Sequence, residues 1–253
     1  MNYNNILFLD IETVSQFETY HHMPADWKEL WDNKSNHLIK NKETESAETI
    51  YHRSGIYAEF GKIVCISCGC IQGTGEDKKI IVKSFVGNDE KSLLIEFAEM
   101  MKKWSMDPTK FLCAHNGKEF DYPYLCRRMI INSVPIPEAL QIAGRKPWEV
   151  RHLDTMELWK FGDYKSYTSL KLLAHILGIP SPKDDIDGSM VNSVYWVEKD
   201  LNRIALYCQK DVVTLAQILL RMNCEPLIKP ENIEYKSWTN EQITPLALNG
   251  RTL

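Results

Sequence analysis

The sequence predicts an α/β domain in which short apolar strands alternate with helices, and three stretches carry this prediction. Residues Asn5–Thr13 form a dense apolar run that is typical of a buried strand. Residues Lys62–Ile71 and Lys79–Val86 have the pattern of two strands joined by a glycine-containing hairpin loop. Apolar residues at helical spacing predict a long helix over Asp200–Met222. Strands and helices in this order favour a sheet that is flanked by helices.

Local start and stop signals indicate the other elements of the domain. Residues Asn88–Trp104 combine an N-cap residue with an apolar stripe at helical spacing. A short buried strand is expected over Lys110–His115. A helix is expected to begin near Pro123, because proline suits the first helical turn. Residues Glu149–Asp154 are consistent with a fifth strand, and Ser169–Leu177 predict a further helix.

Two segments fall outside this alternation of strands and helices. Residues 18–52 are polar, with apolar residues near helical spacing, and form an insertion that is too long for a plain loop. The insertion follows the first strand directly, so it should lie at the mouth of any site there; a surface role without function is the alternative. We expect one domain over residues 1–224, followed by an extended, proline-containing tail over residues 225–253.

The composition is that of a globular protein without a membrane span. The chain has 253 residues, of which 44% are hydrophobic and 25% charged. No apolar run approaches the roughly 18 residues of a transmembrane helix, and the N-terminus lacks the basic start of a signal peptide. We therefore expect a cytoplasmic protein. The formal net charge of −4 argues against nonspecific coating of a duplex, but not against a nuclease whose acids hold cations.

The cysteines do not indicate a disulfide framework or a zinc site. There are seven, an odd number without regular spacing. Cys65, Cys68 and Cys70 lie inside a predicted strand, where free cysteine behaves as a small buried hydrophobe. A zinc site would need a second pair at a suitable distance.

The strongest chemical signal at the N-terminal end is the acidic pair Asp10 and Glu12. Side chains alternate along a strand, so the two carboxylates point to the same side. Two carboxylates at the end of a buried strand repel each other unless a positive charge lies between them. A divalent cation is the usual answer, because hard cations prefer carboxylate oxygens. The alternative is an exposed strand end with two solvated acids.

Two further carboxylates occur at informative positions. Tyr207 and Asp211 are four residues apart on the last helix and share its inward face. A lone buried carboxylate is costly unless it is paired or bound to a metal, and no lysine or arginine lies on the same stripe. Asp121 precedes Pro123 and occupies the N-cap position of its helix, which by itself indicates only a cap.

Three motifs together resemble the exonuclease domain of family B DNA polymerases, within the DEDD superfamily of 3′–5′ exonucleases. The first is Asp10–Glu12, the second runs from Asn116 to Asp121, and the third runs from Tyr207 to Asp211 and has the tyrosine form. Their order and spacing agree over most of the chain. The insertion at residues 18–52 departs from the pattern, and the length leaves no room for the polymerase domains.

The resemblance implies a ribonuclease-H-like fold, a mixed sheet of five strands flanked by helices. It also implies two divalent metal ions, Mg²⁺ or Mn²⁺, and a tyrosine, Tyr207, that orients the attacking water. The implied metal ligands are four carboxylates: Asp10, Glu12, Asp121 and Asp211. The expected contacts to the terminal nucleotide or its phosphates are Thr13, Asn116, Phe120 and Lys183.

The expected function is therefore two-metal-dependent removal of nucleotides from the 3′ end of single-stranded DNA or RNA, with DNA favoured. A non-catalytic nucleic-acid-binding module of the same fold is the alternative, although no motif carboxylate is lost. A replication or repair protein is a possible partner through the C-terminal tail. Phosphatases of the haloacid dehalogenase type also begin with paired acids, but they need an aspartate where this chain has Glu12.

Overall fold

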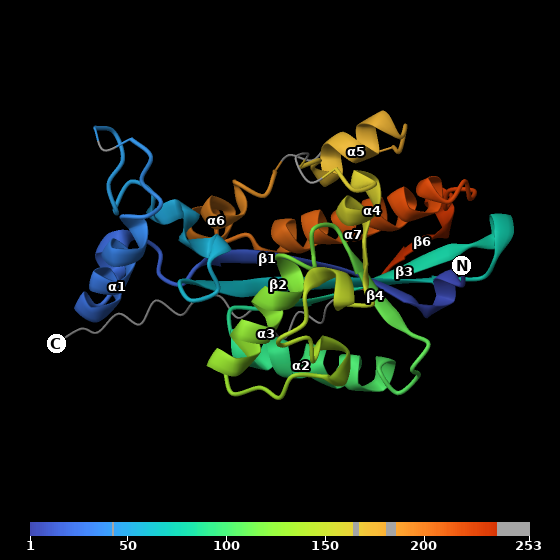
Figure 1. Cartoon of the computed structure of the whole chain (residues 1–253), viewed down its shortest axis with the longest axis horizontal. Coiled ribbons are helices and arrows are strands. Elements are labelled where there is room, and N and C mark those ends of the chain that lie inside the picture. The colour runs from blue at the N-terminus through green and yellow to red at the C-terminus, as the bar shows by residue number, and fades with distance from the viewer. Residues whose placement is uncertain (42, 164–166, 181–185, 237–253) are drawn as a thin grey trace.

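The centre of the computed structural model is a six-stranded sheet with the order β5-β4-β1-β2-β3-β6 (Figure 1). The structure describes residues 1–41, 43–163, 167–180 and 186–236. Only β2 runs against the other strands, because it pairs antiparallel with both β1 and β3 while the remaining pairs are parallel. This is the expected ribonuclease-H-like arrangement. The strands are β1 (Ile6–Ser15), β2 (Gly61–Gln72), β3 (Lys79–Val86), β4 (Phe111–Ala114), β5 (Leu153–Asp154) and β6 (Ile233–Tyr235).

Helices cover both faces of this sheet. The α-helices are α1 (Ala25–Ser35), α2 (Glu90–Trp104), α3 (Asp121–Ile131), α4 (Thr155–Lys160), α5 (Leu170–Ile176), α6 (Val191–Ser193) and α7 (Leu201–Met222). The short helical turns are η1 (Tyr3–Asn5), η2 (Tyr20–His22), η3 (Tyr51–Ile56), η4 (Gly75–Asp77), η5 (Glu138–Leu140), η6 (Pro147–Glu149), η7 (Val194–Glu198) and η8 (Pro230–Asn232). No helix among the described residues combines the length and the apolar character that a membrane crossing requires.

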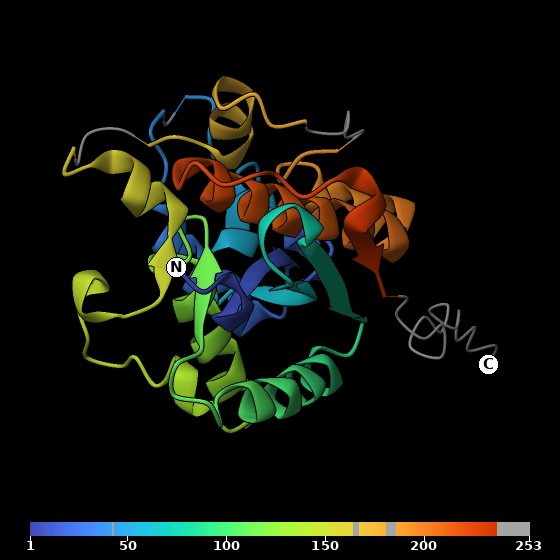
Figure 2. The same cartoon turned by 90° about the vertical axis from the view of Figure 1, so that its right-hand side faces the viewer.

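The alternation of side chains along β1 assigns its residues to two cores. Seen along the sheet, α7 lies on one side and α2 with α3 on the other (Figure 2). Leu7, Leu9 and Ile11 pack in the core beneath α2 and α3, whereas Ile6 and Phe8 pack beneath α7. The next residues of the second set, at positions 10 and 12, must then face α7.

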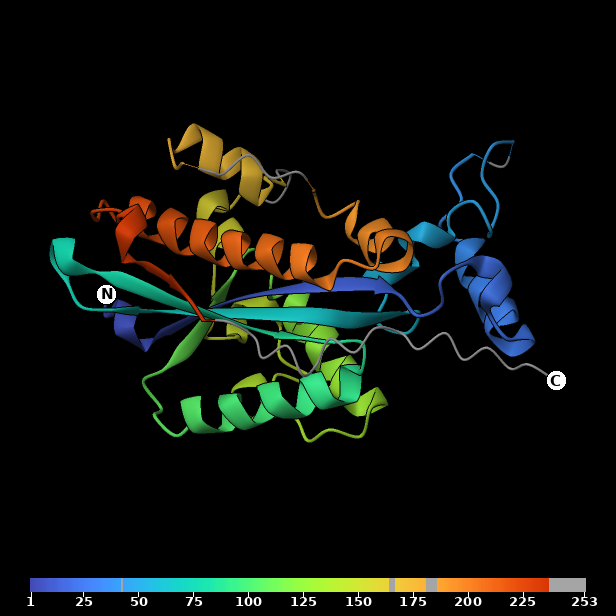
Figure 3. The same ribbon diagram turned by 180° about the vertical axis from the view of Figure 1, so that it is seen from behind.

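The C-terminal segment differs from the expected tail. Ile228 is buried, and its backbone N–H and C=O bond the side-chain amide of Gln217 on α7. Farther on, β6 adds to the edge of β3 as a parallel strand. The sheet thus has six strands instead of five, and the beginning of the predicted tail packs against the domain (Figure 3). The expected strand Glu149–Asp154 is also shorter, because Glu149 ends the helical turn η6.

In the structure the insertion, expected over residues 18–52, comprises the whole segment between β1 and β2, residues 16–60, and has a small core of its own. Trp31 of α1 is fully buried and packs against Tyr51 and Phe60 through edge-to-face ring contacts. Its indole N–H donates to the carbonyl oxygen of Ala47 at 2.7 Å. Burial of aromatic side chains and a satisfied indole N–H give this segment a fixed conformation. The insertion is therefore a packed subdomain rather than a loose loop.

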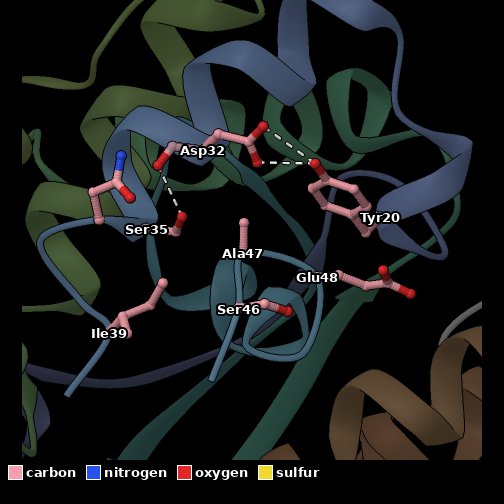
Figure 4. A pocket seen from close by; sticks show the side chains of 8 residues that line it. Tyr20, Asp32, Ser35, Ile39, Ser46, Ala47 and Glu48 are labelled. Atoms are coloured by element: carbon pink, nitrogen blue, oxygen red, sulfur yellow. Dashed lines mark hydrogen bonds between the residues drawn. The ribbon is translucent and has the colours of Figure 1, made fainter. Parts of the chain in front are cut away.

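A hollow of about 320 Å³ lies within the insertion (Figure 4). The Tyr20 hydroxyl donates to the Asp32 carboxylate at 2.9 Å, and the Ser35 hydroxyl donates to the Asp32 carbonyl oxygen. Because these polar groups already bond one another, the hollow offers no converging set of reactive groups. We regard it as a consequence of how α1 packs on the loop that contains Ala47.

A buried ion pair fixes α3 to the rest of the domain. The Arg128 guanidinium bonds the Glu90 carboxylate at 2.5 Å and donates to the carbonyl oxygen of Ala58. Glu90 also accepts the backbone N–H of Ile63 on β2. Every charge in this group has a partner, which a buried pair needs in order to be tolerated. The ion pair thereby holds the C-terminal part of α3 against the start of α2 and against β2.

Candidate active site

Two of the predicted carboxylates lie side by side on β1. Asp10 and Glu12 face α7, and their neighbours across the antiparallel ladder are Ser67 and Cys65 on β2. Asp10 is half-buried, and Glu12 is only 7% exposed. A register shift follows Glu12, and the ladder then continues from Thr13 to Ser15. The pair therefore lies within β1, beside this irregularity, and not at the end of the strand. Glu12 is buried, so the alternative of two freely solvated acids does not apply to it.

The last helix adds Tyr207 and Asp211 to this group. The Tyr207 hydroxyl is hydrogen-bonded to the Asp211 side chain. Burial, followed by the negative charges of Asp211 and Glu12, raises the pKa of Tyr207. The hydroxyl consequently stays protonated and keeps its hydrogen available for donation. The predicted inward face of this helix is thus the face that meets the acids of β1.

Asp121 reaches the same group from the other side of β1. Asp121 is the first residue of α3 and not its N-cap, which is Phe120, so the expected capping role is wrong. The Asp121 carboxylate instead accepts a backbone hydrogen bond from Ile11. The Ile11 N–H is free for this because β4 pairs with β1 only as far as Phe8. The end of the β1–β4 ladder therefore creates the position that Asp121 fills.

Three carboxyl groups of the site have raised pKas, so a bound cation would stabilise their ionised forms. Burial and then the charges of Asp211 and Asp121 raise the pKa of Asp10 well above its usual range. Burial and then the charge of Asp10 do the same for Glu12. The pKa of Asp121 rises to about 7, mainly through burial. Burial and mutual repulsion both disfavour the ionised carboxylates, and a cation between them would favour the ionised forms.

Cys208 is a member of the site that sequence reasoning missed. Ligand atoms of Asp10, Glu12 and Cys208 all lie within 4.8 Å of one another. The Cys208 thiol donates to the Asp10 carboxylate at 3.2 Å. The signal was present in the sequence, since Cys208 shares the inward face of α7 with Asp211. A cysteine next to a carboxylate, however, has no distinctive spacing of its own.

Asp154 positions the segment that carries the second motif. Only 3% exposed, its carboxylate caps α4 by accepting the backbone N–H groups of Met156 and Glu157. It also accepts the N–H groups of Asn116 and Lys118, at 2.9 and 3.1 Å. One carboxylate thus holds two chain segments together.

Three of the four predicted substrate contacts lie in one cleft, and the fourth lies outside the described residues. Asn116 has a positive φ of 65°, and its buried Oδ1 has no hydrogen-bond partner within the described structure. The Phe120 ring is half-buried and packs on Tyr124. Asn116, Phe120 and Thr13 all line the same cleft as the acids of β1. Lys183 lies outside the described residues.

This cleft has a volume of about 760 Å³ and brings together segments that are distant in the sequence. The insertion contributes its η3 end, so the expected position at the mouth of the site is correct. Neither Arg53 nor Tyr167 was expected there, because their positions depend on how long segments fold back. The described residues that line the cleft are Asp10, Ile11, Glu12, Thr13, His52, Arg53, Gly55, Ile56, His115, Asn116, Phe120, Asp121, Tyr167, Gly188, Ser189 and Asn192.

Comparison with known proteins gives one family match. A family model described as "Predicted 3'-5' exonuclease related to the exonuclease domain of PolB" matches residues 56–241. No curated protein matches the sequence. Among solved structures, the chain is similar to the family B DNA polymerase from the hyperthermophilic archaeon Pyrobaculum calidifontis, with 16% identity and a TM-score of 0.47. That similarity covers 85% of this chain and 24% of the polymerase chain.

The matched range has a consequence for the site. It includes Asp121, Tyr207 and Asp211 but begins after Asp10 and Glu12. The association of Asp10 and Glu12 with the other acids therefore rests on the structure, in which the charges of Asp211 and Asp121 act on both residues.

Proposed function

The chain belongs to the family of predicted 3′–5′ exonucleases related to the exonuclease domain of PolB, and on this basis we propose its reaction. It removes nucleotides from the 3′ end of a single strand by hydrolysis of the last phosphodiester, with DNA preferred over RNA. The observation that carries this proposal is the convergence of acids in one cleft: ligand atoms of Asp10 and Glu12 lie within 4.8 Å, and the charges of Asp121 and Asp211 both act on Asp10.

The donor set fits divalent metal ions. Carboxylate oxygens are the ligands that Mg²⁺ and Mn²⁺ prefer. Burial, and after it repulsion between the acids, raises the pKas of Asp10 and Glu12, and bound cations would favour the ionised forms. We propose that Asp10, Glu12, Asp121 and Asp211 hold two such ions. When bound, the ions would supply the positive charge that an in-line attack at phosphorus requires.

The chain's own residues would orient the reactants. Tyr207, protonated and held by its hydrogen bond to Asp211, would direct the attacking water. Asn116 and Phe120 both line the cleft, where an aromatic ring suits stacking of a terminal base. Thr13 lines the same wall. Lys183 remains our candidate for a phosphate contact.

The test is an incubation of the full chain with single-stranded DNA or RNA labelled at the 5′ or 3′ end, in Mg²⁺, Mn²⁺ or EDTA. We expect 5′-labelled DNA to shorten stepwise with release of mononucleotides, only when metal is present. The matched control is Asp10→Asn, which removes one ligand charge and should abolish trimming. Activity in excess EDTA, removal from the 5′ end, or binding of DNA without cleavage would contradict the proposal; the last outcome would favour a non-catalytic module.

We also propose that a replication or repair protein binds through the C-terminal segment. Truncation after Lys236 is the appropriate variant for a pull-down, because it leaves the described strand β6 in place. Truncation at residue 224 would instead remove Ile228 and β6 from the packed domain. Equal capture of partners by the full and the shortened chain would remove this role from the segment.

A further inference from the structure

We propose that Arg53, which the insertion carries into the cleft, binds a non-scissile phosphate of the single strand. This inference rests on the proposed exonuclease function and adds to it a residue that the motifs do not contain. It also gives the insertion a role: the segment supplies a permanent positive charge, which none of the other described residues that line the cleft carries. The scissile phosphate is the last one of the strand, so every other phosphate lies on its 5′ side.

The position of Arg53 is fixed by close packing of η3 on β1. A Cβ added to Gly55 would lie 2.9 Å from the carbonyl carbon of Val14, so only glycine allows this approach. The Gly55 carbonyl oxygen accepts the Tyr124 hydroxyl of α3 at 2.7 Å. The Arg53 N–H bonds the Ile50 carbonyl oxygen. The backbone at Arg53 is thus tied both to the strand that bears Asp10 and Glu12 and to the helix that bears Asp121.

Arg53 is important because the other charged residues that line the described cleft are acids. Three lining residues, Asp10, Glu12 and Asp121, are acids. Of the lining residues that the structure describes, Arg53 alone carries a permanent positive charge. Bound metal ions would offset the acids at the scissile phosphate, but each further phosphate entering the cleft still needs a counter-charge. A guanidinium suits this task, because its planar set of donors matches two phosphate oxygens.

The described structure gives this guanidinium no competing ion pair. No salt bridge of Arg53 occurs among the described residues. The half-buried Glu45 carboxylate accepts the backbone N–H groups of Lys40 and Asn41, and these bonds, more than the charge of Arg53, lower the pKa of Glu45. The half-buried Arg53 side chain is therefore available to an anion in the cleft.

The experiment compares Arg53→Ala, Arg53→Lys and the control Arg127→Ala, an exposed arginine of α3 that does not line the cleft. Two substrates are used: single-stranded DNA, and the p-nitrophenyl ester of thymidine 5′-monophosphate. The ester has a scissile phosphodiester but no second phosphate. For Arg53→Ala we expect KM for DNA to rise about tenfold, because one charge-assisted contact is lost. The ester should be hydrolysed as by the wild type.

The dependence on salt separates a phosphate contact from a structural role. Loss of one contact should reduce the slope of log(1/KM) against log[NaCl] for DNA by about 0.7, the value for one phosphate of a single strand. Arg53→Lys should restore most of this slope, and Arg127→Ala should leave it unchanged. The inference would be overturned if Arg53→Ala kept the wild-type dependence on salt. It would also be overturned if Arg53→Ala lost activity equally on DNA and on the ester. Inactive wild type on both substrates would instead contradict the proposed function.

Discussion

At the scale of single residues, the site depends on carboxylates that repel one another without a cation. Asp211 is the residue on which this repulsion is best tested, because its charge raises the pKas of both Asp10 and Glu12. An asparagine at this position keeps an oxygen that can accept from Tyr207 but removes the charge. The variant thus separates the electrostatic effect from the hydrogen bond.

We predict that Asp211→Asn abolishes activity and stabilises the metal-free protein. Relief of repulsion should contribute about 1 kcal/mol, after solvent and protonation have reduced the gross Coulomb energy. For a domain of this size the melting temperature in EDTA should rise by roughly 2–4 °C. The increase that millimolar Mn²⁺ produces should shrink, because a ligand is lost.

Thermal melts of wild type, Asp211→Asn and the exposed control Glu119→Gln, in EDTA and in Mn²⁺, check this prediction. A structural role for Asp211 gives the opposite sign, since removal of a needed acceptor destabilises the fold. A variant that melts lower in EDTA yet keeps the full shift with Mn²⁺ would take Asp211 out of the metal site.

Residue by residue, the sequence indicates the acids better than it indicates their neighbours. Asp10, Glu12 and Asp211 could be placed because strand alternation and helical periodicity act over a few residues. Arg53 could not be placed, because its position depends on the insertion returning along β1. The position of Asp121 before Pro123 by itself indicates only a cap, and its expected role as a metal ligand came from the resemblance; in the structure its carboxylate accepts the backbone N–H of Ile11 on β1.

At the scale of elements, the second motif depends on a single acid outside it. The Asp154 carboxylate accepts four backbone N–H groups, two before α3 and two at the start of α4. Its removal leaves buried donors without partners, and each such donor is costly.

We predict that Asp154→Ala lowers the free energy of unfolding by about 2–3 kcal/mol and lowers kcat at least about tenfold, because Asn116 and Asp121 lose their fixed positions. Asp154→Asn, which keeps one acceptor oxygen, should be intermediate in both properties. Urea unfolding and single-turnover kinetics measure the two effects. Full activity in a destabilised Asp154→Ala protein would show that this carboxylate stabilises the fold without positioning the motif.

Among the elements, long periodic segments are the predictable ones. The strands β1 to β4 and the helices α2 and α7 could be predicted, because the apolar pattern of each element lies within its own stretch of sequence. By contrast, β6 has three residues next to a proline-containing stretch, and its pairing with β3 requires the chain to pass beneath α7 first. Such a strand has little local signal, since its stability comes from the edge that it joins.

At the scale of the whole molecule, buried histidines make stability depend on pH. The His152 side chain is buried, with Nδ1 accepting the N–H of Leu112 and Nε2 donating to the carbonyl oxygen of Ala139. This arrangement requires the neutral ring. Burial lowers the pKa of His152 below its ordinary value. The neutral form therefore contributes stability above the unfolded pKa of about 6.5, and this contribution is lost as the pH falls through the lower folded pKa.

We predict that wild type loses more stability between pH 8 and pH 5 than His152→Gln does. A glutamine amide offers the same donor and acceptor without a titrating group. Urea unfolding at both pH values provides the measurement, with His37→Gln as the control because His37 is exposed. If His152→Gln and wild type show the same dependence on pH, proton uptake by His152 does not contribute to acid unfolding.

The pairing of β6 with β3 also has a consequence for how the chain is made. Ribosomes add residues from the N-terminus, so β3 is complete long before residues 233–235 exist. At about 5–20 residues per second, the 147 positions from Val86 to Ile233 take roughly 7–30 s. During this interval the outer edge of β3 would present unpaired backbone groups to other nascent chains. Lys79 and Lys83, exposed on β3, place positive charges along that edge and disfavour such pairing until β6 covers it.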